Sequence, residues 1–260
     1  SLVWILRASS AKRGPTYFPS TRPGPAIILL HACNKDRTSW TPLATDLAAQ
    51  GFHVLTLDFR GFGESGGTRF APNQEQQSTI DLYWPGDVEA ALAWLTAQPN
   101  VDKERVGAAG ASCGVNQAVQ LARNHPEVKT VVLLSGGVNA AARLYLRDSA
   151  WLPVFAAASQ GDDGVVEQMR WALGWSRNPA NKFVEYQAAG HGTDMFAAEK
   201  GLEPQVVEWF NQNLRNALLK PVAAPPSPPT PTEQFWITLT SPGGVAKARQ
   251  IYDEAKLAKK

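Results

Sequence analysis

The sequence has few of the residues that would indicate a metal, a cofactor or a cross-linked scaffold. Its 260 residues include only two cysteines, too few for a disulfide framework, and only four histidines. No cluster of His, Cys and Asp has the spacing of a metal site, and no Gly-x-x-x-x-Gly-Lys phosphate loop is present. We therefore expect neither a metal nor an organic cofactor.

The sequence also lacks a charge imbalance and a long apolar run. Its formal net charge is +2, with 25 basic and 23 acidic side chains, which gives no electrostatic reason to expect nucleic acid or a membrane as partner. No apolar run approaches the ~18 residues that span a bilayer. Because the chain begins with Ser1, we expect a processed or trimmed chain that has already lost any signal peptide. A soluble protein, secreted or periplasmic, fits these observations, and the sequence indicates no oligomeric state.

Short apolar runs alternate with helical stretches along most of the chain. Several runs are apolar nearly throughout, which is typical of strands buried on both faces of a parallel sheet. Strands are expected over residues 2–7, 26–31, 53–58, 105–110, 130–135, 153–158 and 182–187. Helices are expected over residues 39–50, 87–97, 113–124, 163–175 and 204–219. The alternation predicts an α/β fold, with a mostly parallel sheet flanked by helices.

Composition divides the chain into three parts. Residues 1–219 carry the alternation and are expected to form one domain, and residues 220–242 form a Pro-rich linker. Residues 243–260 have the apolar spacing of an amphipathic helix, which resembles the first helix of a tetratricopeptide-like module. This helix either packs back on the domain or begins a truncated helical module.

The stretch AAGASCG places two nucleophile candidates, Ser112 and Cys113, side by side. A nucleophile elbow is a strained turn from strand to helix, and the residues two positions before and after the nucleophile must be small. With Ser112 at the centre these flanks are Gly110 and Gly114, whereas Cys113 would place the branched Val115 there. The spacing therefore favours Ser112 as the nucleophile.

A serine hydroxyl needs a base, and the base needs an acid to orient it. Of the four histidines, His191 lies between two glycines just after the last predicted strand, which suits a loop at the carboxyl edge of the sheet. The adjacent Asp162 and Asp163 follow an earlier strand at the same edge. We favour Asp162 as the acid, because Asp163 could instead cap the following helix.

These residues together resemble the α/β-hydrolase fold family, in particular its dienelactone-hydrolase-like branch of small hydrolases. The resemblance covers about residues 1–219, through IILLHACN, LDFRGFGESGG, GASCG, ASQGDD and AGHGTDM in this order. It implies a catalytic domain with the order Ser, Asp, His. It also implies an oxyanion hole made by the backbone amides of Cys33 and Cys113. Dienelactone hydrolases use a cysteine nucleophile, so their substrate is not carried over to Ser112.

The resemblance further implies that the two cysteines flank one oxyanion hole. Their backbones would converge on one oxygen, which places their side chains within reach of a disulfide or a redox-sensitive pair. The alternative is that both cysteines are small apolar fillers.

The resulting prediction is a serine esterase that cleaves small-molecule carboxylic esters through an acyl-enzyme. Only about seventeen residues separate Ser135 from Pro153, too few for a large cap domain, so short-chain or bulky exposed esters are favoured. Tryptophans are candidates for substrate-binding walls, namely Trp84, Trp151, Trp171 and Trp175. The alternatives are a hydrolase of amide, peptide or lactone bonds, and a non-catalytic α/β-hydrolase that acts as a binding module.

Overall fold

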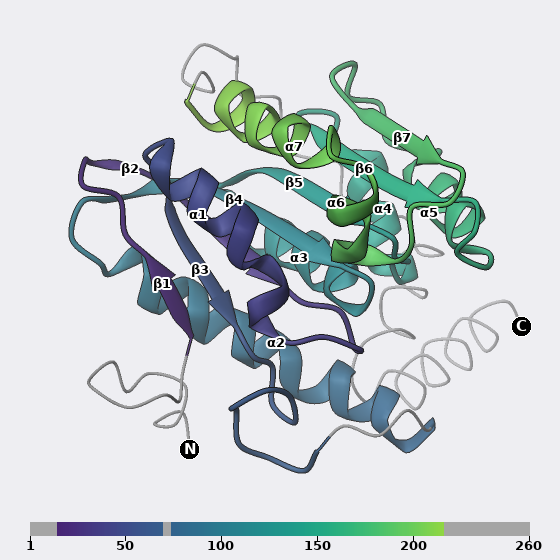
Figure 1. The fold of residues 1–260 in the computed structure, drawn as a ribbon, viewed down its shortest axis with the longest axis horizontal. Coiled ribbons are helices and arrows are strands. Elements are labelled where there is room, and N and C mark those ends of the chain that lie inside the picture. Colours follow the sequence, from purple (N-terminus) through teal and green to yellow (C-terminus); the bar gives the residue numbers. More distant parts are fainter. Residues whose placement is uncertain (1–14, 70–73, 216–260) are drawn as a thin grey trace, which may run out of the picture.

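The computed structural model describes residues 15–69 and 74–215, and Figure 1 shows how their helices and strands are arranged. The strand expected over residues 2–7, the Pro-rich linker and the C-terminal helix lie outside these described residues. They therefore stay predictions.

A seven-stranded sheet forms the centre of the molecule, with the strand order β1-β3-β2-β4-β5-β6-β7. The first strand pairs antiparallel with β3, and all the other neighbours pair parallel. The strands are β1 (Thr16–Phe18), β2 (Gly24–Leu30), β3 (His53–Leu57), β4 (Val101–Ala111), β5 (Val128–Leu134), β6 (Val154–Ser159) and β7 (Lys182–Tyr186). The predicted α/β class with a mostly parallel sheet is therefore confirmed.

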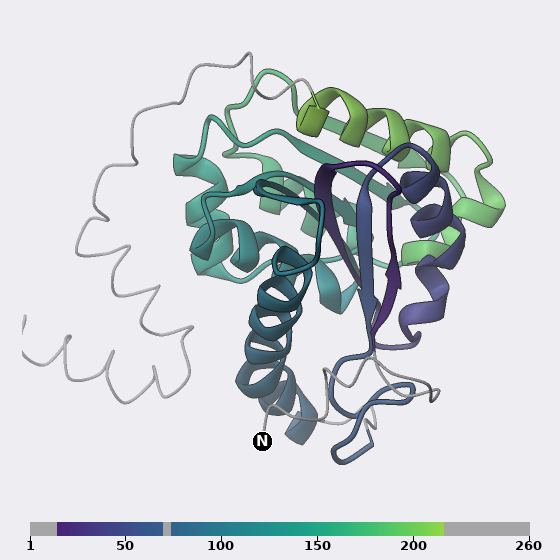
Figure 2. The ribbon, with the colours of Figure 1, turned by 90° about the vertical axis from the view of Figure 1, so that its left-hand side faces the viewer.

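Helices cover both faces of the sheet, which makes three layers (Figure 2). One face packs against α2 (Gln74–Thr96), α3 (Cys113–Asn124), α4 (Ala140–Asp148) and α5 (Val165–Leu173). The other face packs against α1 (Thr41–Ala49), α6 (Met195–Ala198) and α7 (Leu202–Phe210). The short helical turns are η2 (Arg37–Trp40), η3 (Gly192–Asp194) and η4 (Asn211–Arg215). Strands buried between two layers explain why their sequences are apolar throughout.

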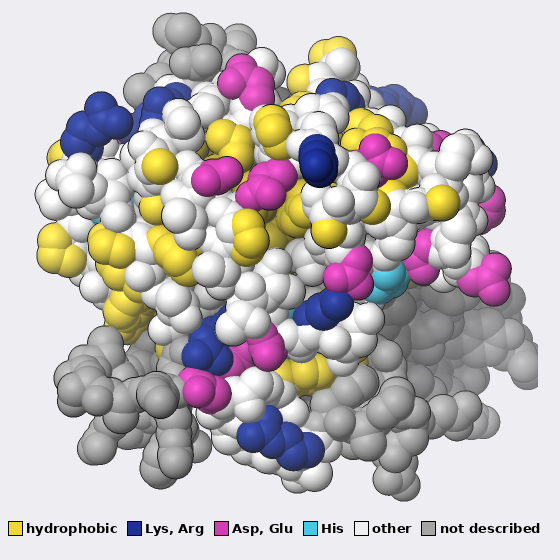
Figure 3. Space-filling model, in the orientation of Figure 1, with side chains coloured by type: hydrophobic (Ala, Val, Ile, Leu, Met, Phe, Trp, Pro, Cys, Tyr) yellow, Lys and Arg dark blue, Asp and Glu magenta, His cyan; other side chains and the backbone are white. Residues whose placement is uncertain are grey.

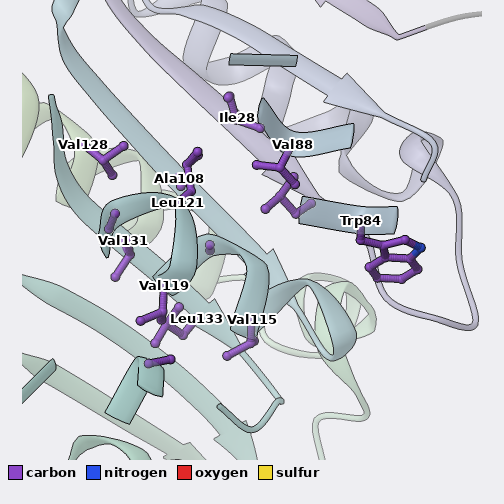
Figure 4. Close-up of a cluster of buried hydrophobic side chains, with 14 of the residues drawn as sticks. Ile28, Trp84, Val88, Ala108, Val115, Val119, Leu121, Val128, Val131 and Leu133 are labelled. Carbon is purple, nitrogen blue, oxygen red and sulfur yellow. The ribbon is translucent and has the colours of Figure 1, made fainter. Parts of the chain in front are cut away.

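The core under α3 fixes the position of the central loops. Val115 and Val119 lie on the buried side of α3, with Leu133 of β5 and Ala108 of β4 in the same cluster (Figure 4). All four side chains are fully buried. Burial of a Val or Leu side chain contributes about 1.5–3 kcal/mol, so the first turn of α3 is firmly held on the carboxyl ends of β4 and β5.

Several elements differ from the sequence prediction, since α4 and α6 were not expected and the helix expected over residues 204–219 gives way to η4 after Phe210. The helix predicted over residues 87–97 begins earlier, at Gln74, and continues through Pro85. The neighbouring Trp84 is fully buried and stacks on Phe59 with 3.7 Å between ring centroids, so packing outweighs the local effect of proline. Strand β1 was not predicted, because three residues are too short to show a periodicity.

The connection between β5 and β6 contains α4 and no inserted domain. This confirms the expectation that a large cap is absent from this connection. The carboxyl edge of the sheet is therefore left without a cap at this point.

Candidate active site

Ser112 occupies a sharp turn between β4 and α3. Its backbone angles are φ 51° and ψ −116°, a left-handed conformation that is strained for a residue with a side chain. Its amide donates to Leu134 O at 2.8 Å, which holds the turn against β5. A Cβ at Gly110 would lie 2.2 Å from Gly114 O, and one at Gly136 would lie 2.4 Å from Ser112 O. The small flanks thus have a steric cause, and the turn is that of a nucleophile elbow.

His191 and Asp162 lie together at the carboxyl edge of the sheet. Asp162 follows β6 and His191 follows β7. His191 Nδ1 and Asp162 Oδ2 are 2.5 Å apart, and both side chains are largely buried, with 29% and 17% exposed. With its Nδ1 proton donated to the carboxylate, the imidazole presents Nε2 as a proton acceptor. Asp163 is exposed, so the structure pairs His191 with Asp162 and not with its neighbour.

The loop that carries His191 lies against the elbow. Gly190 and Gly192 have φ of +85° and +58°, and a Cβ at Gly192 would lie 3.3 Å from Ala111 Cβ. The loop is anchored by Ala189 N, which donates to Ser159 Oγ at 2.9 Å. Ser112 Oγ and His191, both among the described residues, do not form a hydrogen bond in this conformation. Such contacts often tighten only when substrate binds.

The loop after β2 lies beside the first turn of α3. A Cβ at Gly114 would lie 2.4 Å from Leu30 O and 3.0 Å from His31 O, so only glycine permits this approach. Cys33 and Cys113 are joined by a disulfide, with 5.7 Å between their Cα atoms. The two amides that the family resemblance implies for an oxyanion hole therefore belong to covalently linked residues.

His31 holds the base of this loop. Its Nδ1 lies 2.8 Å from Ala32 O, and its Nε2 accepts from Phe59 N at 3.1 Å. The ring is fully buried, and this burial lowers the pKa of His31 below its ordinary value of 6.5. A neutral ring that donates through Nδ1 and accepts through Nε2 satisfies both contacts. His31 is thus a structural residue.

Two ion pairs that the sequence analysis missed anchor the same loop. Lys35 Nζ lies 2.7 Å from Asp194 Oδ1, which joins the loop to the segment after His191. Arg37 pairs with Asp58, which is buried and also accepts from Arg37 N at 2.8 Å. Their sequence signal is their place in the motifs HACNKDR, LDFRG and HGTDM.

Trp84 and Trp151 are not placed where a substrate-binding wall would be. Trp84 is fully buried, with its ring 6.0 Å from that of His31, and it offers no surface to a substrate. Trp151 precedes β6 and lies at the amino edge of the sheet, opposite to Ser112, because α4 carries the chain back before β6 begins. Trp171 and Trp175 are exposed, and the Arg143 guanidinium lies over both rings, at 4.0 and 3.4 Å.

Comparison with known proteins agrees with this fold. Residues 15–217, well over half of the chain, match the family described as X-Pro dipeptidyl-peptidase (S15 family). The chain belongs to this family. The S15 family is a related α/β-hydrolase family, and its description names a peptidase.

Two curated relatives of this S15 chain match over part of their length. An uncharacterised protein of Mycobacterium tuberculosis is 32% identical over 132 residues, which are 50% of this chain and 43% of that protein. Thiohydrolase aneE of Aspergillus aculeatus is 29% identical over 123 residues, which are 46% of this chain and 36% of that protein. The chain thus spans less than half the length of these relatives.

Solved structures resemble this S15 chain over most of their length. Dienelactone hydrolase from Anabaena variabilis has a TM-score of 0.60 at 22% identity, covering 77% of this chain and 92% of that one. An esterase from Pyrococcus furiosus has a TM-score of 0.58 at 20% identity, covering 76% of this chain and 83% of that one. These likenesses show the α/β-hydrolase fold.

A pocket that none of the candidate catalytic residues lines lies on the described surface, with Phe155, Lys182, Gln205, Glu208 and Trp209 among its lining residues. Acidic and basic side chains are interspersed on the face drawn in Figure 3, with no large area of one sign. Among residues 15–69 and 74–215, no group of His, Cys, Asp and Glu is arranged to hold a metal ion. Within the same ranges, each helix is too short or too polar to cross a bilayer.

Proposed function

We propose that this S15 member is a serine hydrolase that cleaves carboxylic esters through an acyl-enzyme. The observation that carries the proposal is the pairing of His191 with Asp162 beside an elbow that presents Ser112. A hydroxyl on a strained turn, a base and an orienting carboxylate are the groups that acyl transfer needs.

In the proposed mechanism, Ser112 Oγ attacks the ester carbonyl while His191 Nε2 takes its proton. Asp162 holds the imidazole tautomer and stabilises its protonated form. The amides of Cys33 and Cys113 donate to the developing oxyanion, each worth about 3 kcal/mol of transition-state stabilisation. His191 then protonates the leaving alcohol, and water repeats the cycle on the acyl-enzyme.

The short connection through α4 supports a preference for short-chain or bulky exposed esters. No cap is inserted between β5 and β6 to enclose a long acyl chain. The proposed substrate site does not include the four tryptophans. Trp84 is fully buried, Trp151 lies before β6, and the Arg143 guanidinium covers the rings of Trp171 and Trp175.

Peptide hydrolysis is the second candidate, and the family description favours it. A carboxylate near the site would help to bind the free N-terminus of such a peptide through a charge-assisted hydrogen bond to its ammonium. Asp194 is close to the site, but it is already paired with Lys35 at 2.7 Å. Because this pair is half exposed and exchanges easily, the experiment below decides between the two candidates.

The test compares p-nitrophenyl butyrate with Ala-Pro-p-nitroanilide on the same enzyme. The proposal expects a higher kcat/KM for the ester and a loss of at least about 10³-fold in the Ser112→Ala variant. Ser149→Ala is the matched control, because Ser149 is a buried serine at the opposite edge of the sheet.

A higher kcat/KM for the anilide would favour the peptidase. Full ester turnover by Ser112→Ala would reject Ser112 as nucleophile, and absence of turnover and of fluorophosphonate labelling would indicate a binding module.

A further inference from the structure

We infer that the Cys33–Cys113 disulfide is a positioning element of the oxyanion hole, and that turnover depends on whether this bond is oxidised. The inference rests on the proposed function. It goes beyond that function because it makes the bond itself, rather than only the two amides, a determinant of the rate of acyl transfer.

The bond joins the two segments that must supply the oxyanion donors. Cys113 is the first residue of α3, where backbone amides have no partner within the helix and point outward. Cys33 belongs to the loop after β2, and it is separated from Cys113 by 80 residues along the chain. The disulfide holds their Cα atoms 5.7 Å apart. Two donors at this separation can approach a single oxygen from two sides.

The other anchors of the loop act at neighbouring residues. His31 holds the carbonyl of Ala32 at 2.8 Å, and Lys35 N donates to the same carbonyl at 3.0 Å. The pair of Lys35 with Asp194 lies near the surface, with 31% and 52% of the side chains exposed. These contacts fix the ends of the turn, whereas the disulfide links the Cys33 peptide directly to the turn that carries Ser112. Oxyanion stabilisation requires donors within a narrow distance of the oxygen, so a small displacement of Cys33 would affect the transition state more than substrate binding.

We expect a small dithiol to reach the bond. Both cysteines are partly exposed, and Ser112 Oγ lies 3.9 Å from Cys113 Sγ. A dithiol reduces the bond by thiol–disulfide exchange. One of its thiolates attacks one sulfur and expels the other cysteine as a thiolate, and the second thiol then resolves the mixed disulfide. Two electrons and two protons pass to the cysteines, and the dithiol becomes a cyclic disulfide.

The test measures kcat and KM for p-nitrophenyl butyrate before and after reduction. The enzyme is treated with dithiothreitol, desalted under anaerobic conditions and titrated for two free thiols, and its fold is checked by circular dichroism. We expect kcat to fall about 10- to 100-fold, with KM changed less than about twofold, and diamide to restore kcat. The affinity for a boronic acid, which forms a tetrahedral adduct on serine, should fall by the same factor as kcat.

The Cys33→Ala/Cys113→Ala double variant controls for other effects of the reductant. It should show the kcat of the reduced wild type, and dithiothreitol should not change it. If this variant does not fold, reduction of the folded wild type carries the test alone.

An unchanged kcat and boronate affinity in the fully reduced, folded enzyme would overturn the inference. A purely structural bond would give that result together with a lower Tm, and the proposed function would stand. If the oxidised enzyme neither cleaves esters nor binds the boronate, the proposed function fails and the inference fails with it.

Discussion

Replacement of Gly114 by alanine tests the link between the turn at Ser112 and the loop after β2, which carries Cys33. The added Cβ would lie 2.4 Å from Leu30 O, whereas ordinary contacts begin near 3.4 Å. The nearest atoms are backbone atoms of β2 and its following loop, so no side chain can rotate away. The first turn of α3 and the end of β2 must therefore separate by about 1 Å, a displacement of the kind that costs on the order of 10²-fold in turnover.

The same substitution has a smaller effect on stability. Overpacking costs about 1–3 kcal/mol, and the higher helix propensity of alanine recovers up to about 1 kcal/mol. We expect the free energy of unfolding to fall by about 1–2 kcal/mol, measured by urea denaturation with tryptophan fluorescence.

The matched control is Gly66→Ala. A Cβ at Gly66 would meet nothing within 4 Å, so this variant should keep wild-type kcat and a free energy of unfolding within about 0.5 kcal/mol. A Gly114→Ala variant that matched this control in both kcat and stability would refute the reasoning that close packing of α3 on the loop after β2 controls turnover.

Three further predictions concern the acid, the buried histidine and the disulfide. Asp162→Asn should lower kcat about 10³- to 10⁴-fold while Asp163→Asn changes it less than about twofold, and equal losses would contradict the pairing at 2.5 Å. Burial lowers the pKa of His31, so below pH 6.5 this histidine binds a proton more readily in the unfolded chain than in the folded one. The free energy of unfolding, measured by urea denaturation, should therefore fall as the pH drops below 6.5, and His31→Asn should flatten this dependence. Reduction of Cys33–Cys113, whose separation is 80 residues, should destabilise the fold by up to about 4.5 kcal/mol, and an unchanged Tm would contradict this value.

The common placement of the candidate residues could be predicted because it follows from chain order. Parallel strands end at one edge of a sheet, so residues just after β4, β6 and β7 meet there however far apart they are in sequence. The glycines around Ser112 added a steric signal, and the structure shows the backbone atoms that cause it.

The contacts that depend on three-dimensional packing could not be predicted in this way. Trp84 looked like a pocket wall because its partner Phe59 lies on a different segment. The Lys35–Asp194 pair joins residues whose separation gives no local pattern. The sequence favoured Asp162, which pairs with His191, but its reason was wrong, because the N-cap of α5 is Gly164 and not Asp163.

The central claim, that Ser112 is the nucleophile, is tested most directly by mapping the site of covalent modification. The enzyme is treated with a fluorophosphonate, digested and analysed by mass spectrometry. The account predicts one adduct per chain on Ser112 Oγ, with labelling much slower in Asp162→Asn. An adduct on another residue, or wild-type labelling of the Ser112→Ala variant, would contradict it.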